Sequence, residues 1–485
     1  MQRLNRETAG VGPAPTEAIL QFGGGNFLRA YAEWIVAAYN RQAKSPLGVL
    51  VANNSDRKIY RDWQAQDGLF HLLTRGLRDG EVVDEVELIT NVSRVISLDR
   101  DWETFLASAE QPEIRYIFSN TTEAGIRFVS GDGLDGEAPD EFPARLAAWL
   151  HRRFRHCRGA AERGCIIFPF ELVENNGEQL RDLVLRNAAE WGLGAEFTDW
   201  VTAHCVFCNT LVDRIVPGIG DPERAEVMER IGYDDAVATQ AEPYHLLAIE
   251  APEAVRAELP LDRLGLNIRY VDDLTPYRRS KVAILNGAHT AMVPVGYLGG
   301  METVGQTLED AVTGGFVRNL IFKEIIPTLD LPEVDLEQYA RDVLDRFRNP
   351  FIHHRLLSIS LNSVTKFRTR ILPTLLDYLD KRSSAPPRMV LAWAALLHFY
   401  RGKREGEEIP LRDDPWALAF LQDAWASVSR DEAGMNELSR RTLAWEQAWA
   451  ADLSGRPGLV RALASGLSAI EEQGMARAVA QLPEA

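Results

Sequence analysis

Up to residue 273, this chain of 485 residues alternates between short apolar runs and helical patterns, and this alternation is the strongest constraint on its fold. The runs are rich in β-branched and aromatic residues and are bounded by turn residues. In order they read AILQFGG, LGVLVANN, IRYIFSN, GCIIFPFEL and HCVFCN. Such alternation is typical of βαβ units, so residues 1–273 are predicted to form an α/β domain with a mostly parallel, doubly wound sheet.

The alternation of strands and helices is interrupted at two places. Asp79-Gly80 lies between two strand-like runs, which predicts an antiparallel excursion through a hairpin. From residue 274 onward the apolar residues recur at helical spacing, so residues 274–485 are predicted to form an all-α domain. Because ligand sites favour clefts between domains, the active site is expected in the interdomain cleft.

Composition excludes several classes of function. The formal net charge is −17, which argues against a nucleic-acid or anionic-membrane binder because such proteins need basic surface. The N-terminus has no apolar stretch of signal-peptide length, no segment is long enough to cross a bilayer, and four cysteines do not form a disulfide framework. A cytoplasmic protein is expected. Cys205 and Cys208 form a C-x-x-C, but without a second pair they are interpreted as buried core residues rather than a metal or redox site.

A glycine turn follows the first predicted strand. Gly23 and Gly25 fill the first two positions of a dinucleotide-binding fingerprint, in which they allow a tight turn and a close backbone approach to a pyrophosphate. Leu28 stands at the third position, and Ala30 is the nearest small residue. With Asn26 and Phe27 this segment is predicted to bind NAD in a Rossmann-type domain, the alternative being a plain βα turn.

Residues at the ends of two further predicted strands are candidates for contacts with the cofactor. Asn53 and Asn54 stand where an acidic residue usually meets the adenosine ribose, and Asp56, Arg57 and Lys58 follow, so NADP is not excluded. After another strand come three residues whose hydroxyl and amide groups are predicted to contact the cofactor, namely Ser119, Asn120 and Thr121. The alternative is that they cap the following helix.

The segment SKVAILNGAHT carries three polar side chains in an apolar run. On an α-helix, Lys281 would lie at about 0°, His289 near 80° and Asn286 near 140°, so all three share one broad face. A dehydrogenase needs a proton donor and groups that polarise the carbonyl oxygen. Lys281 fits the first role, Asn286 with Asn209 the second, and His289 would orient a substrate hydroxyl, with no metal required. Alternatively, these side chains make only local helix bonds or meet solvent.

The Lys-x-x-x-x-Asn-x-x-His spacing after VDDLTPY resembles the signature of the mannitol dehydrogenase family, the polyol-specific long-chain dehydrogenases. Further matching segments are ILQFGGGNFLRA, FSNTTEAGI, FCNTLVDRIVPG and RFRNPFIHH with SVTKFRTRILP, from residue 18 to the C-terminus. They are most similar to the branch that interconverts tagaturonate and altronate. The resemblance implies a Rossmann-type domain followed by a helical domain and NAD-dependent, metal-independent chemistry. It also implies Lys281 as general acid/base, Asn209 and Asn286 as oxyanion clamp, and His289 as the orienting group.

The chain departs from the mannitol-specific pattern at two places. Glu171-Leu172 replaces an Asp-Asn pair, and Asn362-Ser363-Val364 replaces Asp-Gly-Ser before a late lysine. These changes argue against mannitol as the substrate. The resemblance implies instead a ketouronate, D-tagaturonate, which is reduced with NADH to D-altronate. Fructuronate reduction, mannitol oxidation by a 2-dehydrogenase and NAD sensing without turnover remain alternatives. The family resemblance also implies a monomer or small homo-oligomer.

A uronate carries a carboxylate, which requires a local cation in a protein of this net charge. The segment SVTKFRTRILP offers three, Lys366, Arg368 and Arg370. Lys366 or Arg368 is predicted to bind the substrate carboxylate.

Overall fold

The computed structural model describes residues 1–54, 56–122, 125–131, 133 and 138–483, and within it the chain divides into two compact units. The first consists of Met1–Arg75 and Val82–Leu274. The second consists of Gly76–Glu81 and the chain from Thr275 onward. In the described part, no helix is both long enough and apolar enough to cross a membrane.

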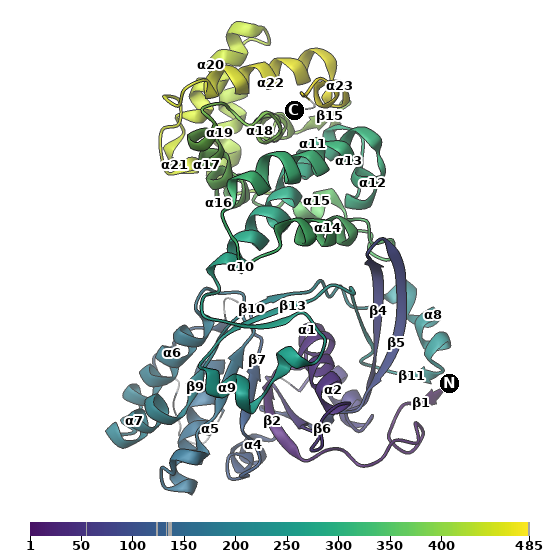
Figure 1. The fold of residues 1–485 in the computed structure, drawn as a ribbon, viewed down its shortest axis with the longest axis vertical. Coiled ribbons are helices and arrows are strands. Elements are labelled where there is room, and N and C mark those ends of the chain that lie inside the picture. The colour runs from purple at the N-terminus through teal and green to yellow at the C-terminus, as the bar shows by residue number, and fades with distance from the viewer. Residues whose placement is uncertain (55, 123–124, 132, 134–137, 484–485) are drawn as a thin grey trace. The chain divides into compact units, whose positions relative to one another are not determined.

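The first unit contains the parallel sheet that the sequence predicts (Figure 1). Its strands are β1 Gln2–Arg3, β2 Glu17–Phe22, β3 Gly48–Asn53, β4 Phe70–Arg78, β5 Glu81–Ile89, β6 Val92–Ser97, β7 Tyr116–Ser119, β8 Ile166–Pro169, β9 Val206–Phe207, β10 Asn209–Asp213, β11 Tyr233–Asp234, β12 Thr239–Ala241, β13 Leu246–Glu250 and β14 Ile268–Val271. Its helices are α1 Asn26–Leu28, η1 Arg29–Glu33, α2 Trp34–Asn40, α3 Lys58–Gln64, α4 Trp102–Ser108, α5 Phe142–Cys157, η3 Ala161–Arg163, α6 Asn176–Glu190, α7 Ala195–His204, α8 Asp221–Ile231, α9 Glu253–Glu258 and η4 Leu261–Arg263.

Six strands form one sheet in the order β6-β3-β2-β7-β8-β9, and every pairing in it is parallel. The order reverses between β2 and β7, which is the point where open α/β sheets bind ligands outside the carboxyl ends of their strands. The predicted doubly wound sheet is confirmed. The predicted antiparallel excursion is also confirmed, because β4 and β5 are neighbours joined by Asp79 and Gly80, both at positive φ.

Successive residues of these strands face opposite sides of the sheet, as the pleat requires. On β3, Val49 and Val51 belong to one apolar core and Leu50 to the other. The first core is shared with η1 and α2, and the second with α5, α6 and α7. Because both faces are covered by helices, the strands read as nearly continuous apolar runs in the sequence.

The cysteine pair lies inside this unit. Cys205 and Cys208 are buried thiols at the two ends of β9, and burial raises the pKa of Cys208 to about 12. Thiols that remain protonated and inaccessible are inert. The structure therefore confirms that the pair belongs to the core.

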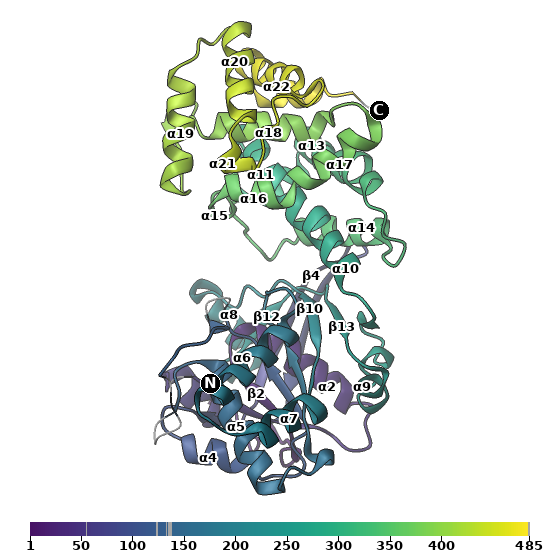
Figure 2. The ribbon, with the colours of Figure 1, turned by 90° about the vertical axis from the view of Figure 1, so that its left-hand side faces the viewer.

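The second unit is helical (Figure 2). Its elements are α10 Thr275–Ser280, η5 Lys281–Gly287, α11 Ala288–Leu298, α12 Val304–Glu309, α13 Ala311–Asn319, η6 Leu320–Ile325, η7 Ile326–Thr328, α14 Leu336–Phe347, α15 Leu356–Ile359, α16 Ser363–Arg370, α17 Leu372–Arg382, α18 Pro387–Phe399, β15 Lys403–Arg404, β16 Glu407–Glu408, α19 Pro415–Ala426, α20 Glu432–Leu443, α21 Glu446–Trp449, α22 Leu459–Gln473 and α23 Met475–Ala480. The short antiparallel pair β15-β16 is a small correction to the all-α prediction.

Helix α18 forms the centre of the second unit, where it packs between α11 and α22. From Arg388 to Phe399 every residue is buried, as expected of a helix that is apolar on all sides. Trp393 packs against Phe367 and Trp449, with ring centroids 5.0 and 4.9 Å away. This aromatic cluster fixes α16, which carries the predicted carboxylate-binding residues, to the core of the unit.

Candidate active site

The glycine turn after β2 has the backbone that a dinucleotide site requires. Gly23 has φ +97°, in the region that favours glycine. A Cβ on Gly24 would lie 2.6 Å from Asn53 Oδ1, whereas a Cβ on Gly25 would meet no atom within 4 Å. Gly25 is thus unfilled on its outer side, so a ligand can approach its backbone. Leu28, at the position of the missing third glycine, packs beneath the turn, 3.4 Å from where a Gly23 Cβ would be.

The buried side chain of Arg29 stabilises this glycine turn, a role that the sequence does not predict. Its guanidinium is buried and donates hydrogen bonds to the carbonyl oxygen of Gly24 and, at 2.6 Å, to Oδ1 of Asn26. It also lies 5.6 Å from the ring centroid of Trp63. Burial lowers the pKa of Arg29 to about 10, so the side chain remains charged at neutral pH. The neighbouring Phe27 stacks on a tyrosine of η1 and fixes the start of the helix.

The end of β3 carries an amide that lacks partners within the protein. Asn53 is fully buried beside Gly24, and neither its Oδ1 nor its Nδ2 has a hydrogen-bond partner among the described residues. By contrast, Asn54 accepts a hydrogen bond from Arg145, and Asp56 pairs with arginines of the first unit. Buried amides without partners are costly, so Asn53 fits a site that a polar ligand such as a ribose completes.

The loop after β7 contacts Glu171. Oγ of Ser119 donates to Glu171 Oε2 at 3.1 Å, the backbone N–H of Thr121 donates to Oε1 at 3.0 Å, and Asn120 donates to the carbonyl oxygen of Phe170. Burial raises the pKa of Glu171 to about 7. The three predicted cofactor contacts thus lie together at the carboxyl end of β7, next to the glycine turn in the sheet. Glu123 and Ala124 of the same motif lie outside the described residues.

Asn209 belongs to the first unit, whereas the other three predicted catalytic residues belong to the second. Its Oδ1 accepts the N–H groups of Gly177 and Glu178 at 3.0 and 3.3 Å, which satisfies free donors in the first turn of α6. Its Nδ2 donates to Glu250 Oε1 at 3.4 Å. These contacts describe a helix-capping role.

The segment Lys281–Gly287 forms a π-helix and not the α-helix that the sequence predicts. In a π-helix each N–H bonds to the carbonyl five residues earlier, so residues five apart come nearly into line. Lys281 and Asn286 are five apart, so the π-helix aligns them better than the predicted α-helix would. The α-helical spacing resumes with α11, which carries His289 three residues later.

Gly287 is the last residue of this π-helix, and its lack of a side chain lets α16 approach. A Cβ at Gly287 would lie 3.1 Å from the carbonyl oxygen of Arg370, which is closer than most Cβ contacts in proteins. A π-turn widens the helix locally, and such turns occur frequently at functional sites. The π-helix thus ends at the residue where α16 comes closest to this segment.

His289 is held by aromatic packing. Its ring stacks on Phe347 with centroids 4.2 Å apart, and it meets His354 edge-on at 5.3 Å. Its Nε2 is buried without a hydrogen-bond partner in the described part of the chain. Burial and nearby positive groups hold the pKa of His289 well below its usual range, so the imidazole is neutral. A neutral ring with a free nitrogen can bind a hydroxyl group.

The positive groups near His289 come chiefly from α14 and α16. They are Arg346, Lys366 and Arg370. Nζ of Lys366 donates to the carbonyl oxygen of Ile359 at 2.8 Å, and burial lowers the pKa of Lys366. Arg368 is two residues from Lys366, so about 200° of helix rotation turns it away from this cluster. Of the two alternatives predicted to bind the carboxylate, Lys366 lies on the same side of α16 as Arg370, and Arg368 lies on the other side.

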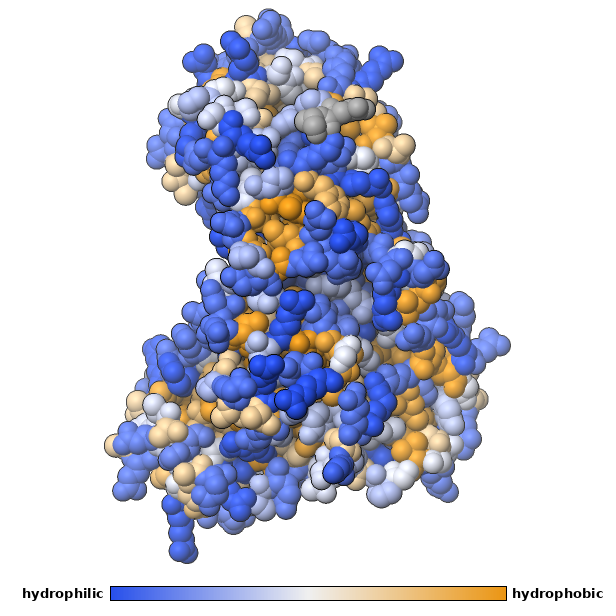
Figure 3. All heavy atoms as spheres, in the orientation of Figure 1, coloured by the Kyte–Doolittle hydropathy of each residue, from blue (hydrophilic) through white to orange (hydrophobic). Residues whose placement is uncertain are grey.

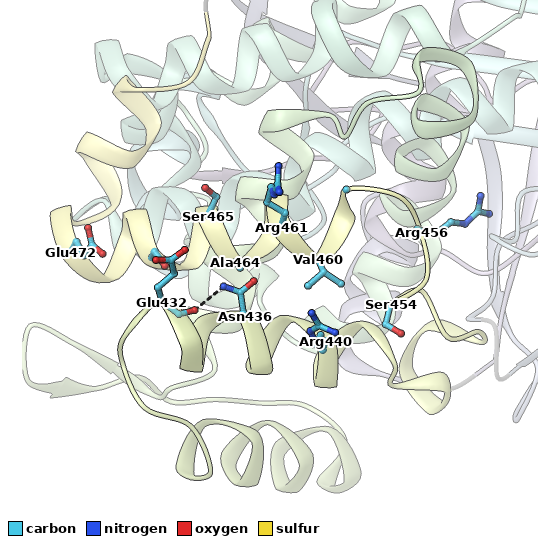
Figure 4. A pocket seen from close by; sticks show the side chains of 12 residues that line it. Glu432, Asn436, Arg440, Ser454, Arg456, Val460, Arg461, Ala464, Ser465 and Glu472 are labelled. Carbon is cyan, nitrogen blue, oxygen red and sulfur yellow. Dashed lines mark hydrogen bonds between the residues drawn. The ribbon is translucent and has the colours of Figure 1, made fainter.

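A large groove elsewhere in the second unit carries no comparable chemistry. It has a volume of about 870 Å³ and lies between α20 and α22 (Figure 4). Its lining includes Glu432, Asn436, Arg440, Ser465 and Glu472, and none of the residues predicted from the sequence. Among the described residues, no group of three or more His, Cys, Asp or Glu is arranged to hold a metal ion.

Two family models match the chain, the mannitol dehydrogenase Rossmann domain over residues 17–263 and the mannitol dehydrogenase C-terminal domain over residues 273–471. The chain belongs to the mannitol dehydrogenase family. The family predicted from the sequence is confirmed. As a member, the protein is an oxidoreductase that acts on CH–OH groups with a nicotinamide cofactor.

Two similar proteins indicate the branch of the mannitol dehydrogenase family to which the chain is most similar. The chain is 46% identical to the altronate oxidoreductase of Yersinia pestis over 481 residues, 99% of each chain. It is 46% identical to that of Klebsiella pneumoniae (strain 342) over 483 residues, 99% of this chain and 100% of the relative. These relatives confirm the predicted branch of the family.

Solved structures support the fold of this family member. One is Pseudomonas fluorescens mannitol 2-dehydrogenase in a ternary complex with NAD and D-mannitol, with a TM-score of 0.67, 23% identity and 99% of each chain covered. The other is a substrate-free D-sorbitol dehydrogenase, with a TM-score of 0.80, 20% identity and coverage of 98% of this chain and 100% of that one.

Proposed function

We propose that this enzyme catalyses the NADH-dependent reduction of D-tagaturonate to D-altronate, with Lys281 as general acid/base. The observation that carries the proposal is the group of cations around the neutral His289, in a protein whose net charge is −17. Positive groups beside a substrate-orienting residue favour an anionic substrate over a neutral sugar. The relatives named altronate oxidoreductase, at 46% identity over nearly the whole chain, support the same substrate.

The glycine turn and the residues around it fit a nicotinamide dinucleotide. Gly23 and Gly25 would bring the backbone to the pyrophosphate, with Asn26 and Phe27 at the start of the helix and Asn53 at a ribose. Ser119, Asn120 and Thr121 would contact the nicotinamide half. When bound, the cofactor supplies the hydride. NAD is the proposed form, and NADP is the alternative that Arg57 would favour.

In the second unit, Lys281 would give its proton to the carbonyl oxygen as the alcohol forms, and would take it back in the reverse reaction. Asn286 would donate an N–H to the same oxygen while negative charge develops on it. Nε2 of His289 would bind an adjacent hydroxyl and fix the sugar chain. Asn209 remains a predicted second donor, although its contacts with α6 support a structural role equally well. Since Lys281 transfers the proton, the proposed reaction requires no metal ion. Enzyme activity should therefore be unchanged after treatment with a chelator.

A panel of substrates tests the proposal. NADH oxidation is measured with D-tagaturonate, D-fructuronate and D-fructose, and each is repeated with NADPH. We expect kcat/KM to be highest for tagaturonate with NADH. A preference for fructuronate would show that the enzyme is a fructuronate reductase. A preference for fructose would support a mannitol 2-dehydrogenase. Binding of NADH without turnover of any of the three would support a sensor.

A further inference from the structure

The guanidinium of Arg370 lies partly buried in the second unit without a carboxylate partner. Its only hydrogen bond among the described residues runs from Nη1 to Oγ1 of Thr290, and at 3.5 Å it is at the limit of such a bond. No ion pair with Arg370 is formed in that part of the chain. Burial lowers the pKa of Arg370, with no compensating acidic group. A desolvated cation without a counter-ion is costly unless a ligand supplies one.

Arg370 lies directly against the Lys-Asn-His signature. Thr290 follows His289, and the backbone carbonyl of Arg370 faces Gly287, which follows Asn286. Thr290 itself donates to the carbonyl oxygen of Asn286 at 2.8 Å, so its hydroxyl is already committed as a donor and can only accept from Arg370. The guanidinium therefore contacts the same turn of helix that carries two of the proposed catalytic residues.

The other cations near this turn are less available. Lys366 uses its ammonium on the carbonyl oxygen of Ile359. Arg346 is almost fully buried and lies near Asp342, whose pKa is raised by burial in spite of the nearby guanidinium. Arg368 lies on the opposite side of α16 from Lys366 and Arg370. Of the cations near His289 in the described part of the chain, Arg370 is the one that is left with N–H donors to offer a ligand.

We propose that Arg370 binds the carboxylate of the substrate and thereby makes the enzyme specific for sugar acids. A guanidinium offers two parallel N–H donors that match the two oxygens of a carboxylate, which an ammonium does not. The assignment rests on the proposed function only in requiring an acidic substrate, not in requiring tagaturonate. It moves the anchor from Lys366 or Arg368, which the sequence predicts, to the next turn of the same helix.

Equilibrium binding tests this assignment without depending on turnover. Calorimetry on the full-length enzyme saturated with NADH, in which an alcohol cannot be oxidised, measures the Kd of D-altronate, D-mannonate and D-gluconate, with D-mannitol as the neutral probe. The variants are Arg370→Gln, Arg370→Lys and, as the matched control on the other face of α16, Arg368→Gln. Thermal melting confirms that each variant is folded, and Arg370→Lys replaces Arg370→Gln if the latter does not fold.

For the tightest-binding acid, we expect Arg370→Gln to raise Kd by about 10–100-fold, which is the range of a charge-assisted hydrogen bond. Arg370→Lys should raise it less, because the charge remains and the two-point contact is lost. Kd for mannitol should change little, and Arg368→Gln should match wild type. The inference is overturned if no acid binds the wild type, or if Arg370→Gln weakens acids and mannitol equally or leaves acid binding intact. Which acid binds best tests the proposed function separately, because mannonate in place of altronate would refute tagaturonate while leaving Arg370 as the anchor.

Discussion

The ring of His289 stacks on the ring of Phe347, with centroids 4.2 Å apart and an angle of 30° between the planes. Aromatic packing, and not a hydrogen bond at Nε2, thus orients this imidazole. The same packing excludes water and contributes to the low pKa of His289. A neutral, oriented imidazole surrounded by cations suits a site that binds both the hydroxyl groups and the acid group of its substrate.

Replacement of the lysine tests the catalytic assignment. We expect Lys281→Ala to lower kcat for the best ketouronate by about 10²–10⁴-fold, the usual contribution of a general acid/base. The Kd of NADH, measured by fluorescence titration, should change little, since the predicted cofactor contacts lie in the first unit. Lys403→Ala, at an exposed position of the second unit, is the control. Near-native turnover in Lys281→Ala would refute the assignment.

The glycine turn makes a prediction that separates ligand contact from folding. A Cβ at Gly25 meets no protein atom within 4 Å, and its φ of −66° suits any residue. Gly25→Ala should therefore leave the melting temperature unchanged and yet raise the Kd of NADH about tenfold or more, because the methyl group would occupy the path of the pyrophosphate. Unchanged NADH binding would show that the cofactor does not approach Gly25.

Two helix glycines form a matched pair in the second unit. In Gly287→Ala the new methyl group would lie 3.1 Å from the carbonyl oxygen of Arg370, so we expect a loss of about 1 kcal/mol in the free energy of unfolding and a higher KM. Gly305→Ala adds a methyl group to a helix where nothing lies within 4 Å, and should stabilise by about 0.5–1 kcal/mol. Urea denaturation measures both. Equal stabilisation by the two variants would mean that α16 does not require close approach at Gly287.

Glu171 predicts a pH dependence of stability. Burial raises its pKa to about 7 in the folded protein, above the value of 4.5 in the unfolded chain. The folded state therefore holds the proton more tightly, and this contribution is fully present below pH 4.5 and is lost as the pH rises through 7. Glu171→Gln is permanently neutral, so at pH 8 it should be more stable than wild type by about 3 kcal/mol, and near pH 4.5 the two should be similar.

Denaturation curves at pH 4.5, 6 and 8 measure this difference. Glu229→Gln, at an exposed position of α8, serves as the control and should show no such trend. A difference between Glu171→Gln and wild type that stays constant with pH would contradict the raised pKa.

Much of the fold could be predicted from local patterns. The five apolar runs became β2, β3, β7, β8 and β9, because a parallel sheet covered on both faces requires continuously apolar strands. Asp79-Gly80 gave the predicted hairpin because two adjacent residues at positive φ require such a pair. Periodicity also predicted the helical second half, apart from the short β15-β16 pair.

For the candidate site, the sequence predicted which residues take part but not the contacts that position them. The spacing of Lys281, Asn286 and His289 was visible in the sequence, as was the glycine turn. The role of Arg29 was not, because a charged residue near the start of a helix gives no sign that it will be buried against the carbonyl oxygen of Gly24. The partners of Asn209 were hidden in the same way, since α6 lies some thirty residues earlier in the chain.

The sequence by itself determined which side chains are present, the order of strands and helices, and the family. Only the tertiary structure decided that Lys281–Gly287 is a π-helix and that Arg370 lies beside it. The reason is physical. Periodicity reports which face of a helix is buried, whereas the hydrogen-bonding register and the choice among Lys366, Arg368 and Arg370 depend on how closely α16 packs against Gly287, a contact between residues 83 positions apart in the sequence.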